Sequence, residues 1–107
     1  MAIPTNRLLM EFERLLREAN RAAINPILDE LTLAKLKPMA ELVARARAAY
    51  LKRLHDLAVQ YEGTEDLPTD AEMTALAELR GRFLDLVEGS KSIETAIQRG
   101  YLDVNGG

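Results

Sequence analysis

Apolar residues in the middle of the chain recur with the period of a helix. Between Met39 and Tyr61 they fall at positions 39, 43, 46, 50, 54, 57 and 61, in steps of three and four. This spacing places them on one face of an α-helix, whereas a half-buried strand alternates at every second residue. The pattern therefore predicts a helix over about 38–62. Further apolar residues widen its apolar arc to about 180°, more than a single neighbouring helix covers.

An earlier stretch carries a second stripe of the same period. Its members are Leu8, Phe12, Leu15, Ala19 and Ala22, widened by Leu9, Leu16 and Ala23. Together they cover an arc of roughly 140°, which is typical of a helix that faces a core. We expect a helix over about 6–23, with Thr5 as its N-cap.

Prolines and glycines mark the expected helix boundaries. Asn25-Pro26 suits a helix start, and Pro38 disfavours helix at the residue before it. The preferred interpretation is a separate short helix over 26–36; the alternative is one long helix that is kinked at Pro38. Residues 62–68 are predicted to form a loop, with Gly63 at a helix C-cap.

The C-terminal part begins with a strong local signal. Thr69 and Glu72 form an S/T-x-x-E capping box directly before an apolar-periodic run, which predicts a helix that ends at Gly89. A last short helix would begin at Ser90 or Ser92 and end at Gly100. We expect residues 101–104 to pack as an extended tail and residues 105–107 to fray.

The expected fold is all-α: a small antiparallel helical bundle with three main helices and one or two short helices, forming a single domain over 1–107. The chain has 107 residues, of which 48% are hydrophobic and 29% charged, as is ordinary for a soluble globular domain. It contains no cysteine, and its first residues lack the pattern of a secretory signal. A cytoplasmic location is therefore expected.

Charge is distributed unevenly along the chain. Residues 1–60 contain 10 Lys and Arg against 7 Asp and Glu, whereas residues 61–107 contain 4 against 10. Neither half is a polybasic surface, which argues against nucleic acid as the partner. Helices that lie on membranes carry Lys and Arg along their polar face, whereas Glu and Arg alternate here, so no membrane partner is expected.

The sequence offers little catalytic chemistry. His55 is the single histidine, and Lys52 stands where a Glu-x-x-His metal motif would need its carboxylate. The glycines form no phosphate-binding loop. We therefore predict no catalytic residue, cofactor or metal.

The predicted function is that of a small protein–protein interaction module (an adaptor, regulator or assembly subunit) that acts as a homodimer or binds another protein. The wide arc over 38–62 suggests where a partner binds. The predicted interface residues are Leu42, Leu51 and Ala58 at the margins of the arc, with Tyr50 and Tyr61 as aromatic anchors. The competing interpretation is that short helices cover these margins within the monomer.

Two alternatives from other classes stay open. One is a nucleic-acid-binding regulator that uses the C-terminal helix pair on either side of Gly89 as a helix-turn-helix. The other is a small helical enzyme whose polar site is assembled by the fold from residues such as Arg47, Tyr50 and His55.

Overall fold

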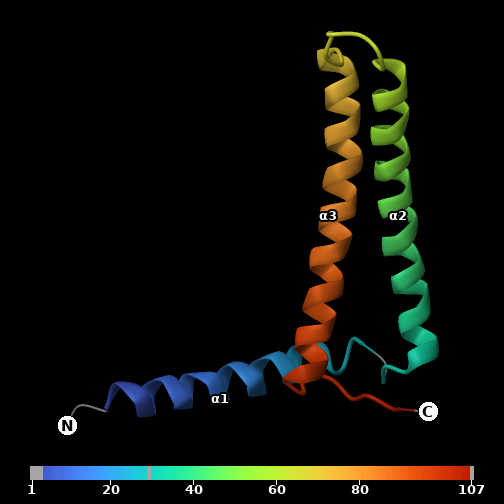
Figure 1. Cartoon of the computed structure of the whole chain (residues 1–107). Helices are drawn as coiled ribbons and strands as arrows, with labels where there is room; N and C mark the ends of the chain where they lie inside the picture. Colours follow the sequence, from blue (N-terminus) through green and yellow to red (C-terminus); the bar gives the residue numbers. More distant parts are fainter. Residues whose placement is uncertain (1–3, 29, 107) are drawn as a thin grey trace. The chain divides into compact units, whose positions relative to one another are not determined.

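A computed structural model describes residues 4–28 and 30–106. Within them it contains three helices and no strand: α1 (Thr5–Ile24), α2 (Leu33–Gln60) and α3 (Asp70–Gln98) (Figure 1). The all-α prediction is confirmed. The chain divides into two compact units, a terminal unit (Met1–Leu36 with Ser92–Gly107) and a hairpin unit (Lys37–Lys91). Whether they fold as the single domain expected over 1–107 stays a prediction.

The hairpin unit consists of α2 and α3 with the loop between them. The two helices lie side by side in Figure 1, and contacts in the middle of this unit and at its loop end join them. Tyr50 of α2 meets Phe83 of α3, and Tyr61, just after α2, meets Glu72 of α3. Leu57, at 3% exposure, is the most deeply buried residue of this unit. The loop leaves α2 through Gly63, whose φ of +75° favours glycine, as the sequence predicts.

The predicted capping box starts α3. The Glu72 backbone N–H donates to Thr69 Oγ1 at 3.2 Å, and the Thr69 N–H donates to Glu72 Oε1 at 2.9 Å. These two bonds satisfy backbone donors that the first turn of a helix leaves unpaired.

Two predicted helix boundaries are wrong. Among the described residues of 26–36 there is no separate short helix. Instead α2 begins at Leu33, where Thr32 Oγ1 accepts the Lys35 N–H at 3.2 Å, and Pro38 lies inside α2. Likewise α3 continues through Gly89. A proline removes one helical hydrogen bond, and an interior glycine lowers helix stability by about 1 kcal/mol relative to alanine. Neither loss is large enough to end these long helices. Both sites nevertheless lie beside the junctions of the two units, at 36/37 and 91/92.

The terminal unit contains α1, the segment that leads into α2, the end of α3 and the C-terminal tail. Pro4, and not Thr5, occupies the N-cap of α1, and no side chain caps this end. Gly100, with a φ of +71°, ends α3. The Gly100 and Tyr101 N–H groups donate to the carbonyls of Ile97 and Ala96, which is a Schellman motif.

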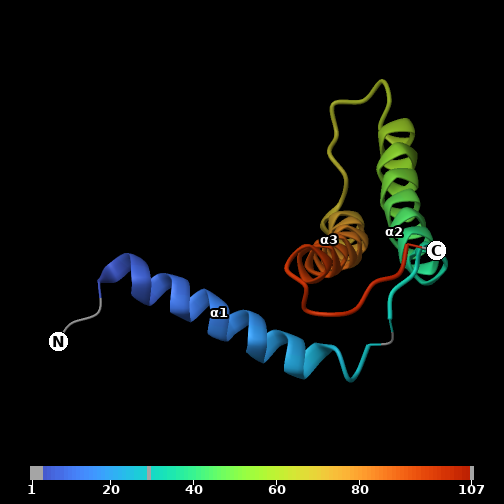
Figure 2. The same cartoon turned by 90° about the horizontal axis from the view of Figure 1, so that it is seen from below.

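The tail is held by hydrogen bonds and by one buried side chain; Figure 2 shows its course from the end of α3 toward the start of α2. Leu102 is 3% exposed, and Val104 forms an isolated parallel bridge with Leu31. Arg21 of α1 donates to Asp103 Oδ1 at 2.6 Å, and the Asp103 N–H donates to Asn25 Oδ1 at 3.0 Å. The predicted packing of residues 101–104 is confirmed, although Tyr101 and Leu102 lie in a bend and are not extended. The predicted fraying is wrong at Asn105, whose N–H donates to the Leu31 carbonyl at 2.8 Å; Gly107 lies outside the described residues.

Leu102→Ala is expected to loosen the terminal unit. Removing a buried leucine side chain costs about 2 to 5 kcal/mol of unfolding free energy, because a cavity replaces its contacts. Urea unfolding should show the loss, and hydrogen exchange of the Leu31 and Asn105 amides should accelerate. Val104→Ala is the matched control: half of this side chain is exposed, and the change should cost less than about 1 kcal/mol. Equal effects of the two variants would contradict Leu102 as the anchor.

Candidate interaction surface

An aromatic cluster closes the middle of the hairpin unit. The Tyr50 and Phe83 rings are stacked, with centroids 6.3 Å apart and planes 12° from parallel. The Arg47 guanidinium lies over the Phe83 ring, 5.1 Å from its centroid, and forms a cation–π contact. Stacked rings and cation–π contacts each contribute of the order of 0.5–1 kcal/mol. Tyr50 thus packs within the hairpin, and its contact with a second chain stays a prediction.

Tyr61 lies at the loop end of the hairpin unit. Its hydroxyl donates to Glu72 Oε1, the same oxygen that accepts the Thr69 N–H. The hydrogen bond from Tyr61, followed by that from Thr69, lowers the pKa of Glu72 from 4.5 to about 2. The same bond to Glu72 raises the pKa of Tyr61. Tyr61 therefore joins the two ends of the loop, and its role at an interface also stays a prediction.

The outer part of α2 carries the other predicted interface residues. Leu51 and Ala58 are both exposed, and at about 100° per residue they lie about 20° apart on the helix. Leu54, 44% exposed, borders them. Leu42 is exposed as well, but nine residues separate it from Leu51, which places it on the opposite side of α2. The structure thus groups Leu51 with Ala58 and separates Leu42 from them.

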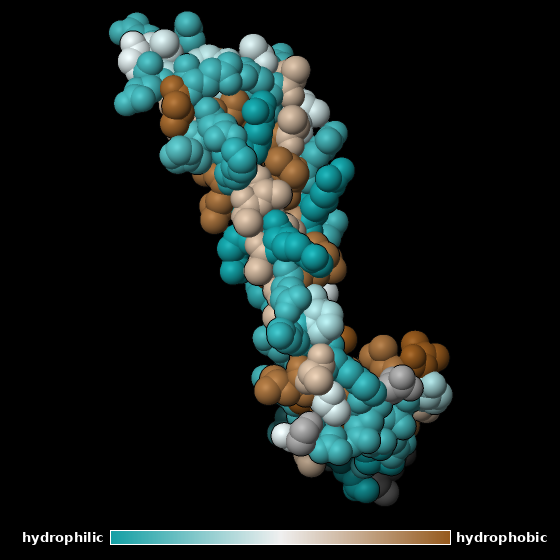
Figure 3. All heavy atoms as spheres, turned by 90° about the vertical axis from the view of Figure 1, so that its right-hand side faces the viewer, coloured by the Kyte–Doolittle hydropathy of each residue, from teal (hydrophilic) through white to brown (hydrophobic). Residues whose placement is uncertain are grey.

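The neighbouring side of α3 is also apolar and exposed. Met73 and Leu84 lie about 20° apart on that helix, and Arg80 lies between them and Phe83. Arg47, which lies about 40° from Leu51 on α2, reaches the Phe83 ring, so the two exposed strips adjoin. We call this side of the hairpin the Leu51 face; its members are Ala40, Arg47, Leu51, Leu54, Ala58, Met73, Arg80 and Leu84. Figure 3 shows such apolar side chains at the surface of one face of the molecule, in patches between polar ones.

The largest exposed apolar strip belongs to α1. None of its 20 residues is buried. Leu8, Phe12 and Leu15 are more than half exposed, although they lie on one face. The prediction that this stripe faces a core is therefore wrong within the described part of the terminal unit, where every member of the stripe is exposed. Sequence reasoning missed α1 as a surface because an amphipathic stripe has the same period whether it packs inside the chain or against another molecule.

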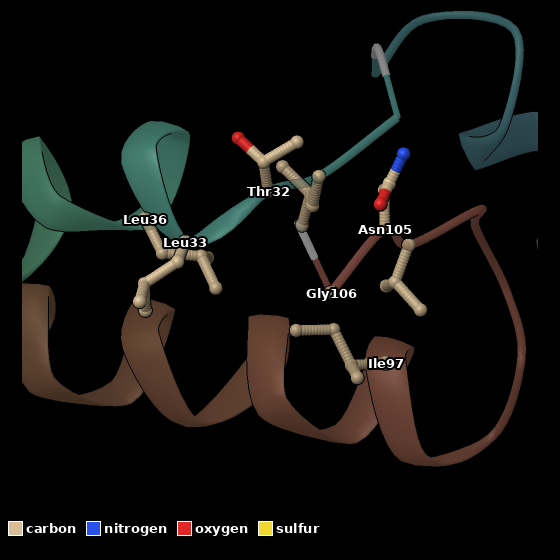
Figure 4. A pocket seen from close by; sticks show the side chains of 8 residues that line it. Thr32, Leu33, Leu36, Ile97, Asn105 and Gly106 are labelled. Atoms are coloured by element: carbon tan, nitrogen blue, oxygen red, sulfur yellow. The ribbon is translucent and has the colours of Figure 1, made fainter.

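Described residues of the terminal unit line a larger and a smaller pocket. The larger, of about 300 Å³, is open and mostly apolar, with Leu33 and Leu36 of α2 and Ile97 of α3 around it (Figure 4). Asn105 and Gly106 of the tail complete its rim. The smaller, of about 160 Å³, is lined by Glu13, Arg17, Arg99 and Tyr101. Apolar side chains line most of the first pocket, whereas charged side chains and one tyrosine line the second.

The candidate polar residues do not assemble as a catalytic group. Arg47 and Tyr50 both contact the Phe83 ring, whereas the His55 side chain is 78% exposed, with Nδ1 3.9 Å from Asp56 Oδ1. Among the described residues, no group of three or more His, Cys, Asp or Glu side chains could hold a metal ion. No helix in the described part of the chain has the length and apolar content to cross a membrane.

The helix-turn-helix interpretation of the C-terminal part is wrong. It requires two helices with a turn at Gly89, and α3 is a single helix from Asp70 to Gln98. The sequence matches no family model and no curated protein, and the fold matches no solved structure.

Tyr61→Phe is expected to raise the pKa of Glu72 from about 2 toward 4.5, because the largest stabilising hydrogen bond is removed. Because the pKa of Glu72 is lower in the folded state than in the unfolded state, the ionised carboxylate stabilises the fold at pH values above about 4.5. This contribution is lost as the pH falls from about 4.5 to about 2. Unfolding of the variant should therefore depend less on pH in that window. Carboxyl resonances in an NMR titration measure the pKa, and Tyr101→Phe is the control. A wild-type Glu72 that titrates near 4.5 would contradict this assignment.

Proposed function

We propose that this chain is a small cytoplasmic protein–protein interaction module, an adaptor, regulator or assembly subunit, that acts as a homodimer. The observation that carries the proposal is the contrast between exposed and buried apolar residues. Sixteen large hydrophobic side chains are exposed among the described residues, while only Leu57, Ala96 and Leu102 are buried hydrophobic ones. Contiguous exposed apolar surface of this kind marks protein interaction sites.

Self-association is the simplest way to cover these surfaces. In a symmetric dimer both chains contribute the same surfaces. A single contact and its symmetry-related copy therefore complete the assembly. The antiparallel bundle expected from the sequence would then be completed by helices of two chains. The Leu51 face contributes two predicted interface residues, Leu51 and Ala58, to that contact.

Light scattering on a size-exclusion column is expected to give twice the chain mass of 11.9 kDa at micromolar concentration. Leu51→Glu should shift the mass to that of the monomer, because a buried unpaired carboxylate is strongly unfavourable. Circular dichroism should show that the variant stays helical and unfolds cooperatively.

Leu67→Glu is the matched control, since Leu67 lies in the loop of the hairpin unit at 84% exposure. This variant should remain a dimer. A wild-type chain that is monomeric across the concentration series would overturn the proposed homodimer. Loss of helical structure in Leu51→Glu would place Leu51 in the core of the folded monomer.

A further inference from the structure

The smaller pocket of the terminal unit is lined by charged groups from two segments that lie far apart in the sequence. Glu13 and Arg17 come from α1, where one helical turn separates them. Arg99 and Tyr101 come from the residues that directly follow α3. The pocket has a volume of about 160 Å³, which is room for several water molecules at about 30 Å³ each, so one small ion fits inside it.

Hydrogen bonds hold the two walls of this pocket in place. Arg21 lies one helical turn beyond Arg17 on the same side of α1, and its guanidinium donates to the Gly100 carbonyl at 3.0 Å. On the other wall, the Tyr101 N–H donates to the Ala96 carbonyl at 2.9 Å, as part of the Schellman motif that ends α3. The backbone that carries the lining side chains is therefore fixed on both sides of the pocket.

Both arginines of the pocket lack a carboxylate partner. Among the described residues, neither Arg17 nor Arg99 has a carboxylate within ion-pair distance. By contrast, Arg14 and Arg21 of α1 pair with carboxylates at 2.6 to 2.9 Å. Two guanidinium groups in one small pocket repel each other, and Glu13 offsets one of their two charges. One positive charge remains, which favours an anion as the ligand.

The donors of the pocket suit a tetrahedral oxyanion. A guanidinium group presents its N–H donors in a planar fork, and one such fork already matches the two oxygens of a carboxylate. Two forks from different segments of the chain need an acceptor with more oxygens, and a phosphate group provides them. Tyr101 lines the same pocket and carries a hydroxyl that can donate to a further oxygen.

We infer that this pocket binds a phosphate group, with Arg17 and Arg99 as its main ligands and Tyr101 as a further donor. Bound phosphate connects α1 to the end of α3. It stabilises the terminal unit, because a ligand that binds only the folded state shifts the folding equilibrium toward that state. Glu13 weakens the binding, since its carboxylate repels the anion and competes for the guanidinium groups. The site is separate from the Leu51 face, so it does not depend on the proposed homodimer.

A titration of the full chain with inorganic phosphate at constant ionic strength tests this site. NMR spectra of the arginine Nε–H groups should show shifts at Arg17 and Arg99, with a dissociation constant on the order of 1 mM. Acetate should bind about tenfold more weakly, because its two oxygens satisfy only one guanidinium fork. Methyl phosphate distinguishes the sources of the group: binding as tight as that of the free ion supports a phosphate ester as the ligand, and weaker binding supports the free ion.

Substitutions in the pocket should have effects of opposite sign. Arg17→Gln or Arg99→Gln should raise the dissociation constant for phosphate about tenfold, the effect of losing a charge-assisted hydrogen bond. Glu13→Gln should lower it, because the competing carboxylate is removed. Arg7→Gln in α1 and Arg82→Gln in α3 are the matched controls. Each removes one positive charge from an arginine that does not line the pocket, and each should leave the binding unchanged.

Hydrogen exchange provides an independent readout of the coupling to the terminal unit. Phosphate should slow exchange of the Asn105 amide, which donates to the Leu31 carbonyl in this unit, and should leave exchange in the hairpin unit unchanged. Circular dichroism should show that all variants keep their helical structure, since the substituted side chains are exposed.

Three results would overturn the inference. The first is phosphate binding that is equally strong in Arg17→Gln and in Arg7→Gln, which would show a general effect of charge. The second is acetate binding as tight as phosphate binding. The third is weaker phosphate binding by Glu13→Gln, which would show that the carboxylate contributes to the ligand contact. None of these results bears on the oligomeric state of the chain.

Discussion

The structure depends on how little apolar surface two helices can bury against each other. A helix is stable in a protein when its apolar stripe is covered, because propensity alone seldom holds it in water. In the hairpin unit, α2 and α3 cover one side of each other through Leu57 and the Tyr50–Phe83 stack, while the Leu51 face is left open. The exposure of the Leu51 face and the burial of only Leu57 among the hydrophobic residues of the hairpin unit follow from this constraint. It also motivates the proposed association with another chain.

Local signals in the sequence predicted elements well where the responsible interactions are themselves local. The capping box at Thr69 and Glu72 and the positive φ of Gly63 and Gly100 need only neighbouring residues, and the structure contains all of them. Pro38 and Gly89 are different, because whether a helix ends there depends on how much the rest of the helix gains from packing. Each lowers helix stability by a limited amount, which α2 and α3 tolerate. Both residues lie near the junctions of the two units, but the inferred helix ends were wrong.

The candidate surface could be predicted only in part, because periodicity reveals that a side chain is on an apolar face and does not reveal what covers it. Leu51 and Ala58 were inferred from an arc that is too wide for one neighbour, and they are exposed in the structure. For Tyr50 and Tyr61 the same arc could not distinguish contacts with α3 from contacts with a second chain, and the structure shows the contacts with α3. The strip of α1 has the most regular amphipathic pattern in the chain, and that regularity suggested a core. Only coordinates could show that the described members of this strip are exposed.

The tail connects these observations. It ends α3 at Gly100, buries Leu102, pairs with Leu31 and accepts a hydrogen bond from Arg21, so residues from both ends of the chain meet at one place. The cost of ordering these residues is offset by a single buried leucine and a few hydrogen bonds, several of them exposed, which contribute little each. A small unit held in this way gains much from any partner that covers α1, because binding adds buried apolar area to a structure that has little. Association and folding of the terminal unit are then linked, and the unit becomes more stable as the concentration of its partner rises.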